Sequence, residues 1–295
     1  IGNTPLVRLK QASELTGCHI YGKAEYFNPG ESVKDRAALF IVQDALKKKL
    51  IAKGGTIVEG TVGNTGIGLA IVCKEYGIKL KIVIPNTQSA EKKETLKKLG
   101  AELIEVDAVP YSNPNNYIKY SKKLADQLKQ KEKNGVYWAN QFDNIANLEA
   151  HVQTTSREIW NQTAGKIDAF ICSSGTGGTI GGVSNFLKEK NKNIKIIAVE
   201  PEDSAVISGR EAGSHSIQGI GAGFIPKNLD VSIIDETLSI SNNSAFYYSR
   251  ELAKCEGIPG GISTGAAIAA AIEIHEKTEM QNLCSVIIVP SFAER

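Results

Sequence analysis

Short apolar segments alternate with longer amphipathic ones along most of this 295-residue chain. The short segments are rich in Val and Ile, which is typical of strands in a parallel sheet that is covered on both faces. The predicted strands are residues 5–9, 19–25, 56–59, 80–84, 102–106, 168–172, 194–199 and 285–289. The predicted helices are residues 33–49, 64–76, 90–99, 117–133, 148–162, 181–189, 243–256 and 265–277. This alternation predicts an α/β fold, with residues 201–230 irregular.

One glycine-rich stretch, Gly175-Thr176-Gly177-Gly178-Thr179, lies between a predicted strand and a predicted helix, and we call it the phosphate loop. Glycines let the backbone approach a ligand closely, and the N–H groups and dipole of a helix N-terminus favour an anion. The loop lacks the Lys-Ser/Thr ending of a P-loop. It partly fits a dinucleotide fingerprint, with Glu200 after the next strand, but Ile180 replaces the third small residue. A tight turn that binds nothing is the structural alternative.

Two further glycine-rich turns are also expected to follow strand-like segments. The first is Gly60-Thr61-Val62-Gly63-Asn64-Thr65-Gly66, which we call the asparagine loop, and the second is residues 219–223. Ligands of open α/β sheets bind at the carboxyl ends of the strands, so the three turns predict sites for a phosphate and for a substrate carboxylate.

Composition excludes several classes of function. The formal net charge of +2, with acids and bases interspersed, predicts no nucleic-acid partner, and lysine runs on helices are expected to be solvated faces. No apolar run approaches the ~18 residues of a membrane span. The four histidines show no metal-ligand spacing, and the five cysteines form no Cys-x-x-Cys pair. We expect a reducing compartment, the cytoplasm, or the mitochondrion if a targeting segment precedes Ile1.

Three side chains are candidates for chemistry. Lys34 begins a predicted helix, where most lysines are simply solvated; burial and the helix N-terminus would instead lower its pKa toward a reactive amine that can form a Schiff base. Ser291 follows the last strand and could hydrogen-bond a ring nitrogen. Gln141 is an ordinary loop amide unless it faces the site.

Several motifs in order along the chain resemble those of the cysteine synthases (O-acetylserine sulfhydrylases), in the cysteine synthase/cystathionine β-synthase family of fold-type II pyridoxal-phosphate enzymes. They are Ile1-Gly2-Asn3-Thr4-Pro5, Asn28-Pro29-Gly30-x-Ser32-Val33-Lys34-Asp35-Arg36, the asparagine loop, Gln141-Phe142, the phosphate loop, Glu200-Pro201, residues 218–226 and Gly261-Ile262-Ser263-Thr264-Gly265-Ala266. Several specific motifs in the family's order make chance an unsatisfactory explanation.

The resemblance implies a role for each candidate residue. Lys34 would be the Schiff-base lysine and would move the α-proton, and the cofactor would be pyridoxal 5'-phosphate. Asn64 would bind its 3′ oxygen, Ser291 its ring nitrogen, and the phosphate loop its phosphate. The substrate α-carboxylate would be bound by Thr61, Val62, Gly63, Thr65 and Gln141, with Gly221, Ala222 and Gly223 closing nearby.

The resemblance also implies an activity and a domain plan. The activity would be β-replacement, which makes L-cysteine from O-acetyl-L-serine and sulfide through an aminoacrylate intermediate. The fold would contain two open, twisted, mainly parallel sheets flanked by helices, with the cofactor between the lobes. The smaller lobe would span residues 27–140, with a mobile part at about 80–129, and the larger lobe residues 1–26 and 141–295. The resemblance further suggests a homodimer that binds the C-terminal tail of serine acetyltransferase.

Two departures from the family pattern leave alternatives open. Val62 replaces a serine in the family's asparagine loop, which removes a hydrogen bond of about 1 kcal/mol, or about 1.5–3 kcal/mol to a charge. Phe292-Ala293 replaces Ser-Gly, and we expect Phe292 to crowd the surroundings of Ser291. The alternatives are a cystathionine β-synthase-like enzyme, an O-phosphoserine sulfhydrylase, a cysteine desulfhydrase, and a weakly active partner of serine acetyltransferase.

Overall fold

The computed structural model describes residues 1–278 and 282–293. The chain divides into two compact units. Unit 1 contains Ile1 and residues 34–147, and unit 2 contains residues 2–33 and 148–295. The family resemblance had suggested changes of lobe after residues 26 and 140, whereas the units change after residues 33 and 147. Each unit contains one sheet, so the α/β fold with two mainly parallel sheets is confirmed.

Unit 1 is built on a four-stranded parallel sheet in the order β5-β4-β3-β6. Its strands are β3 (Thr56–Gly60), β4 (Lys79–Pro85), β5 (Glu102–Val106) and β6 (Val136–Trp138). Its helices are α2 (Lys34–Lys47), α3 (Asn64–Tyr76), α4 (Ala90–Lys98) and α5 (Tyr117–Lys129), and α6 (Ile145–Ala150) runs across the boundary to unit 2. One hydrophobic core joins α2, α3 and α4 to the sheet, and a separate core joins α5 to it. Both faces of β3 are therefore covered, and all five of its residues are buried.

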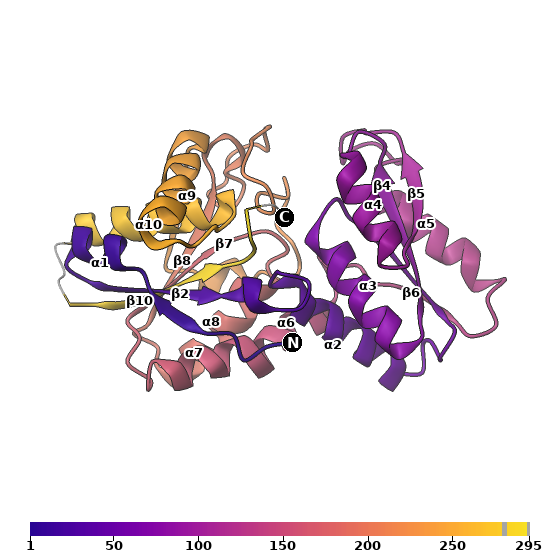
Figure 1. Ribbon diagram of the computed structural model, residues 1–295, viewed down its shortest axis with the longest axis horizontal. Coiled ribbons are helices and arrows are strands. Elements are labelled where there is room, and N and C mark those ends of the chain that lie inside the picture. Colours follow the sequence, from indigo (N-terminus) through magenta and orange to yellow (C-terminus); the bar gives the residue numbers. More distant parts are fainter. Residues whose placement is uncertain (279–281, 294–295) are drawn as a thin grey trace. The chain divides into compact units, whose positions relative to one another are not determined.

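Unit 2 is built on a six-stranded sheet in the order β1-β2-β10-β7-β8-β9, in which only the β1–β2 pair is antiparallel among the described strands. Its strands are β1 (Leu6–Arg8), β2 (His19–Ala24), β7 (Ala169–Ser173), β8 (Lys195–Pro201), β9 (Glu236–Ile240) and β10 (Cys284–Val289). Its helices are α1 (Lys10–Thr16), α7 (Ser156–Gln162), α8 (Gly178–Lys190), α9 (Asn242–Glu256) and α10 (Ile262–Thr278). Figure 1 shows α9 and α10 over one face of this sheet and α7 and α8 over the other.

The alternating side chains of the strands explain these two layers. Ile171, Ile197 and Ile287 pack with α1, α9 and α10, whereas Phe170 and Ile196 pack with α7 and α8. Successive strand residues point to opposite faces, so the central strands of a doubly covered sheet are mainly apolar on both faces. The short segments rich in Val and Ile, on which the prediction of a parallel sheet was based, are these doubly covered strands.

Several element predictions were wrong in detail. The structure adds α1, β6 and β9, and it divides the predicted 148–162 helix into α6, a π-helical turn (His151–Thr155) and α7. Helices α8 and α10 each begin three residues earlier than predicted. Their first turns contain glycines because neighbouring backbone lies close: a Cβ on Gly181 would lie 2.3 Å from the Asn228 oxygen, and one on Gly265 would lie 1.9 Å from the Ala245 oxygen. No helix in the described ranges is long and apolar enough to cross a membrane.

Candidate active site

The asparagine loop in unit 1 joins the carboxyl end of β3 to the first residue of α3, Asn64. The N-cap of α3 is Gly63, which makes no side-chain cap, and the first turn contains no acidic residue. The first N–H groups of a helix have no partner within the helix, so this terminus offers its donors and its dipole to an anion. Thr61 and Thr65 are buried in the same loop, and the Thr61 Oγ1 accepts the Gly63 N–H at 3.3 Å.

Gln141 lies against the asparagine loop. Its Oε1 accepts a hydrogen bond from the Thr65 Oγ1 at 2.5 Å, although the two residues are 76 positions apart in the sequence. Its carbonyl oxygen accepts one from the Asn147 Nδ2 at 2.8 Å. The structure thus brings together Thr61, Val62, Gly63, Thr65 and Gln141, the predicted carboxylate-binding set of unit 1. A Cβ on Gly63 would meet no atom within 4 Å, so the backbone there borders open space.

Lys34 is the first residue of α2 in unit 1 and is half-buried. The segment that leads into it is fixed within unit 2: Ser32 forms a β-bridge with Ser291, and the Val33 N–H donates to the Pro290 oxygen at 2.8 Å. The chain therefore enters α2 from a segment paired with the one that carries Ser291.

The phosphate loop in unit 2 joins β7 to α8. Gly177 is the N-cap of α8 with a left-handed φ of 76°, it makes no side-chain cap, and the first turn contains no acidic residue. A Cβ on Gly175 would lie 2.4 Å from the Gly219 oxygen, and one on Gly177 would lie 2.8 Å from the Leu229 Cβ. Only glycines fit in this packing, and the result is a second uncapped helix N-terminus that suits an anion.

The third glycine-rich turn does not follow a strand, because β8 ends at Pro201 and the turn lies in an irregular segment. It is held beside the phosphate loop instead. The Gly221 N–H donates to the Ser174 oxygen at 3.0 Å, and Gly221 and Gly223 both have left-handed φ values, 65° and 79°. The predicted residues Gly221, Ala222 and Gly223 and the phosphate loop thus form one cluster in unit 2.

Ser291 is buried just after β10, and a Cβ on Gly261 would lie 3.3 Å from its Oγ. Thr264, at the N-terminal end of α10, is fully buried, and its Oγ1 has no hydrogen-bond partner. Phe292 stacks its ring on Tyr26, with the centroids 4.6 Å apart and the planes inclined at 35°. Phe292, which stands where the family pattern has a serine, therefore packs against an aromatic ring of unit 2.

Two residues that sequence reasoning missed touch the predicted ones. His151, in the π-helical turn, is within hydrogen-bond distance of the Thr179 Oγ1 through Nε2 (3.2 Å) and of the Thr155 Oγ1 through Nδ1 (2.9 Å). Glu59, in β3, accepts the Asn140 N–H at 2.8 Å and the Gln141 N–H at 3.5 Å, and burial raises the pKa of its carboxyl to about 8. The sequence did contain a signal for Glu59, because a glutamate next to the apolar Ile57 and Val58 and directly before a glycine-rich loop is unusual.

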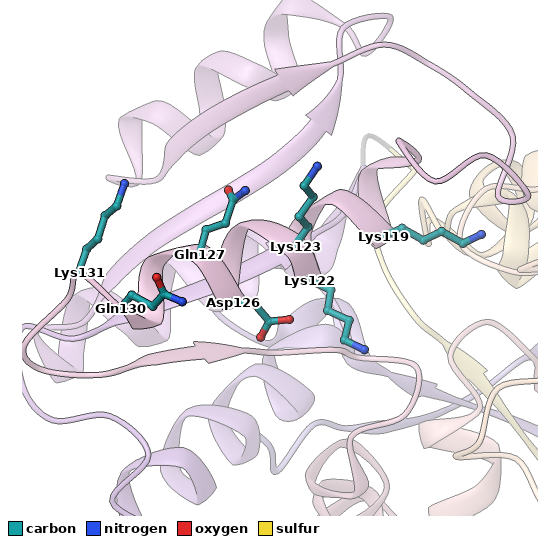
Figure 2. A pocket seen from close by; sticks show the side chains of 7 residues that line it. All are labelled: Lys119, Lys122, Lys123, Asp126, Gln127, Gln130 and Lys131. Atoms are coloured by element: carbon teal, nitrogen blue, oxygen red, sulfur yellow. The ribbon is translucent and has the colours of Figure 1, made fainter.

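The lysine-rich face of α5 forms a shallow pocket that contains none of the predicted site residues. Lys123 and Gln127 point to one side of α5, and Lys122 and Asp126 to the other (Figure 2). Because these side chains do not converge on one point, this arrangement agrees with the prediction that the lysines form a solvated face.

The residues present fit a phosphate-bearing cofactor. The phosphate loop is a glycine cradle that a Cβ would fill, on an uncapped helix N-terminus with no competing carboxylate in its first turn. The buried Ser291 and the unpartnered Thr264 hydroxyl are polar groups of unit 2 that suit a heteroaromatic ring.

Comparisons with known proteins identify the family. The profile of pyridoxal-phosphate dependent enzymes matches residues 1–291. Cysteine synthase 1 of Neurospora crassa is 47% identical over 94% of this chain and 75% of its own length, and the cysteine synthase of Staphylococcus aureus is 46% identical over 100% and 93%.

Solved structures agree with this result. A hydrogen sulfide-producing enzyme from Fusobacterium nucleatum superposes with a TM-score of 0.92 and 42% identity, covering 100% of this chain and 95% of that one. O-acetyl serine sulfhydrylase isoform 3 from Entamoeba histolytica gives 0.91 and 39%, covering 100% and 87%. The chain therefore belongs to the pyridoxal-phosphate dependent enzymes and, within them, to the cysteine synthase family.

Proposed function

We propose that this protein is a pyridoxal-phosphate dependent cysteine synthase, which converts O-acetyl-L-serine and sulfide into L-cysteine and acetate. The observation that carries this proposal is the pair of uncapped helix N-termini, at α3 and α8, each in a glycine-rich loop without an acidic residue in the first turn. One suits the cofactor phosphate and the other the substrate carboxylate. Full-length similarity to cysteine synthases selects this activity among those that use two anion sites.

The residues that would hold the cofactor are those to which the family resemblance gives this role. We assign the cofactor phosphate to the N–H groups and threonines of the phosphate loop, the 3′ oxygen to Asn64, the ring nitrogen to Ser291 and the aldehyde to the amine of Lys34. When bound, pyridoxal phosphate supplies a ring that withdraws electrons from the substrate's α-carbon. Ser291 presents a neutral hydroxyl where a carboxylate would keep the ring nitrogen protonated. This moderates the electron withdrawal and favours loss of a β-leaving group over transamination.

The groups of unit 1 handle the substrate. The hydroxyls of Thr61 and Thr65, the Gln141 carboxamide and the N–H groups of the asparagine loop bind the α-carboxylate and so orient the α-carbon. The Lys34 amine removes the α-proton, the C–O bond to acetate breaks, and hydrosulfide forms the C–S bond at the same β-carbon. Lys34 then returns the proton to the α-carbon.

This chain departs from the family pattern in the loop that binds the substrate carboxylate. Val62 contributes no hydroxyl to the carboxylate site, so Gln141 and the backbone N–H groups carry more of that binding. The likeness to a hydrogen sulfide-producing enzyme makes L-cysteine the second substrate to test, with sulfide as its product.

We also propose that the chain forms a homodimer and binds the C-terminal tail of serine acetyltransferase. Both proposals rest on membership of the family. Sedimentation equilibrium measures the first. Calorimetric titration with a synthetic tail peptide measures the second, and a peptide with its C-terminal carboxylate amidated is the control.

Product analysis tests the proposed function. Protein loaded with pyridoxal phosphate is incubated with sulfide and either O-acetyl-L-serine, O-phospho-L-serine or L-serine, and L-cysteine is measured by mass spectrometry. We expect O-acetyl-L-serine to be the best donor, with one acetate released per cysteine. Lys34→Ala is expected to lower the rate at least about 10³-fold, because it removes both the covalent anchor and the proton-transfer group. Full activity in Lys34→Ala would refute the assignment of Lys34.

A further inference from the structure

Glu59 is a buried carboxyl group that the proposed mechanism does not use. It is the fourth residue of β3, 2% exposed, and it precedes the asparagine loop. Within the described parts of the chain it forms no ion pair with a lysine, arginine or histidine. A carboxyl group kept in the interior without a cation is costly, so its hydrogen bonds identify what it does.

Those hydrogen bonds all lead to the segment that carries Gln141. The Asn140 N–H donates to Oε2 at 2.8 Å, the Gln141 N–H lies 3.5 Å from Oε1, and the Gln141 carboxamide also hydrogen-bonds the carboxyl group. Asn140 has a left-handed φ of 47°, an uncommon conformation that needs support from its surroundings. Because the Gln141 Oε1 accepts from Thr65, its carboxamide is held between Glu59 and the asparagine loop.

We propose that Glu59 is a positioning residue for the substrate carboxylate, which fixes Gln141 against the asparagine loop and whose own proton is linked to carboxylate binding. This inference rests on the proposed function, in which Gln141 and the asparagine loop bind that carboxylate. Glu59 acts through Gln141 and is not assigned a contact with the substrate.

The sign of the linkage follows from burial. Burial raises the pKa of Glu59 to about 8, so the side chain changes from mainly neutral to mainly charged as pH rises through that value. A buried anion beside the loop repels a substrate carboxylate, because the interior screens charges weakly. Substrate binding therefore favours the protonated form, and affinity falls as pH rises through the pKa of Glu59.

The groups around Glu59 come from β4, from the segment after β6 and from α5. Ile82 stands opposite it on β4, and Ala139 follows β6 on the other side. From α5, Tyr117 interacts with Glu59, and burial together with that carboxyl raises the pKa of Tyr117 to about 12, so it stays neutral. Asp143, in the same turn as Gln141, is exposed. Glu59 is thus the group whose charge changes beside the loop.

Steady-state kinetics of three variants tests the proposal. Glu59→Gln cannot ionise and keeps one acceptor oxygen, enough for the shorter hydrogen bond from the Asn140 N–H, while its –NH2 group replaces the second oxygen. Glu59→Leu removes both acceptor oxygens. Glu200→Gln is the matched control: Glu200 is 1% exposed in β8 of unit 2 and likewise accepts backbone N–H groups, from Ile207 and Ser208. For each protein, kcat and the KM for O-acetyl-L-serine are measured from pH 6.5 to 9.5 at saturating sulfide. Ionisation of the substrates affects all four proteins alike.

The expected results separate positioning from a structural role. The wild-type KM rises by up to about tenfold between pH 7 and 9 relative to Glu59→Gln, the limit for one linked proton with a pKa of about 8, while kcat changes little. Glu59→Leu raises KM about tenfold at every pH, and Glu200→Gln follows the wild type. A second readout does not depend on turnover: the infrared difference spectrum of wild type minus Glu59→Gln contains a carboxylic acid band at pH 7 that is lost by pH 9.5.

The outcomes are distinguishable. A Glu59→Gln profile of KM against pH that matches the wild type, or the absence of the infrared band, would overturn this inference and leave the proposed function standing. A wild-type protein that makes no cysteine would overturn the proposed function, and this inference with it.

Discussion

Gly175→Ala tests the glycine cradle of the phosphate loop. The new Cβ would lie 2.4 Å from the Gly219 oxygen, whereas ordinary contacts begin near 3.4 Å, so one of the two backbone segments must shift by about 1 Å. Gly175 is not among the glycines with positive φ, so its backbone conformation suits alanine and the perturbation comes from the lack of space.

The size of the effect follows from overpacking. Inserting a methyl group into well-packed structure costs about 1–3 kcal/mol. Part of this cost destabilises the fold, and the displacement also moves the N–H groups that bind the phosphate. At about 1.4 kcal/mol per tenfold, the Kd of the apoprotein for pyridoxal phosphate would rise about 5- to 150-fold if the whole cost fell on binding, so we expect a rise within this upper limit and a lower Tm for the remainder.

The assay is an equilibrium titration of the apoprotein with pyridoxal phosphate, together with the Tm of the apo and loaded forms. Ser184→Ala is the control on the same helix, because it removes a buried hydroxyl that has no hydrogen-bond partner. It should leave the Kd unchanged and the Tm equal or higher. A wild-type Kd and Tm in Gly175→Ala would refute the assignment of a tightly packed cradle.

Two substitutions in unit 1 test its carboxylate site and its buried carboxyl group. Val62→Ser should lower the KM for O-acetyl-L-serine, because a hydroxyl bonded to a charged carboxylate contributes about 1.5–3 kcal/mol; an unchanged KM would show that residue 62 does not face the substrate. The raised pKa of Glu59 also affects stability. Between pH 4.5 and about 8 the unfolded chain has lost a proton that the folded chain keeps, so the free energy of unfolding decreases as pH rises. Over this window the wild type is expected to lose up to about 5 kcal/mol of this free energy relative to Glu59→Gln. Urea unfolding at pH 5 and pH 9 measures this, and equal differences at the two values would contradict it.

Much of the fold could be predicted because the central strands are buried on both faces. Residues 64–76 were predicted as a helix, and α3 has these bounds: it follows a glycine-rich turn, it is buried on nearly all sides from Thr65 to Cys73, and Gly77 adopts a left-handed C-cap conformation. The short edge elements could not be predicted in this way. Strand β6 has three residues and β9 alternates polar with apolar ones, so neither forms the apolar run that marks the inner strands.

The candidate site was partly predictable for a related reason. Glycine-rich loops between a strand and a helix are visible in the sequence, and the structure has both as uncapped helix N-termini. The pairing of Thr65 with Gln141 joins residues 76 apart and leaves no local pattern. Glu59 was missed although it directly precedes the asparagine loop, because a charged residue in a strand is ordinarily exposed and only the fold shows its hydrogen bonds to residues 140 and 141. His151 was missed because a lone histidine in a helix is ordinarily structural, and only the fold brings it to Thr179.

The central claim is that this chain uses pyridoxal phosphate to replace the acetate of O-acetyl-L-serine with sulfide. The most direct measurement is the visible absorbance spectrum of the loaded protein, recorded alone, after O-acetyl-L-serine and again after sulfide. We predict a cofactor band that O-acetyl-L-serine displaces with release of one acetate, and that returns when sulfide is added as one L-cysteine forms. A protein that develops no visible band with pyridoxal phosphate, or whose band ignores O-acetyl-L-serine, would contradict the account.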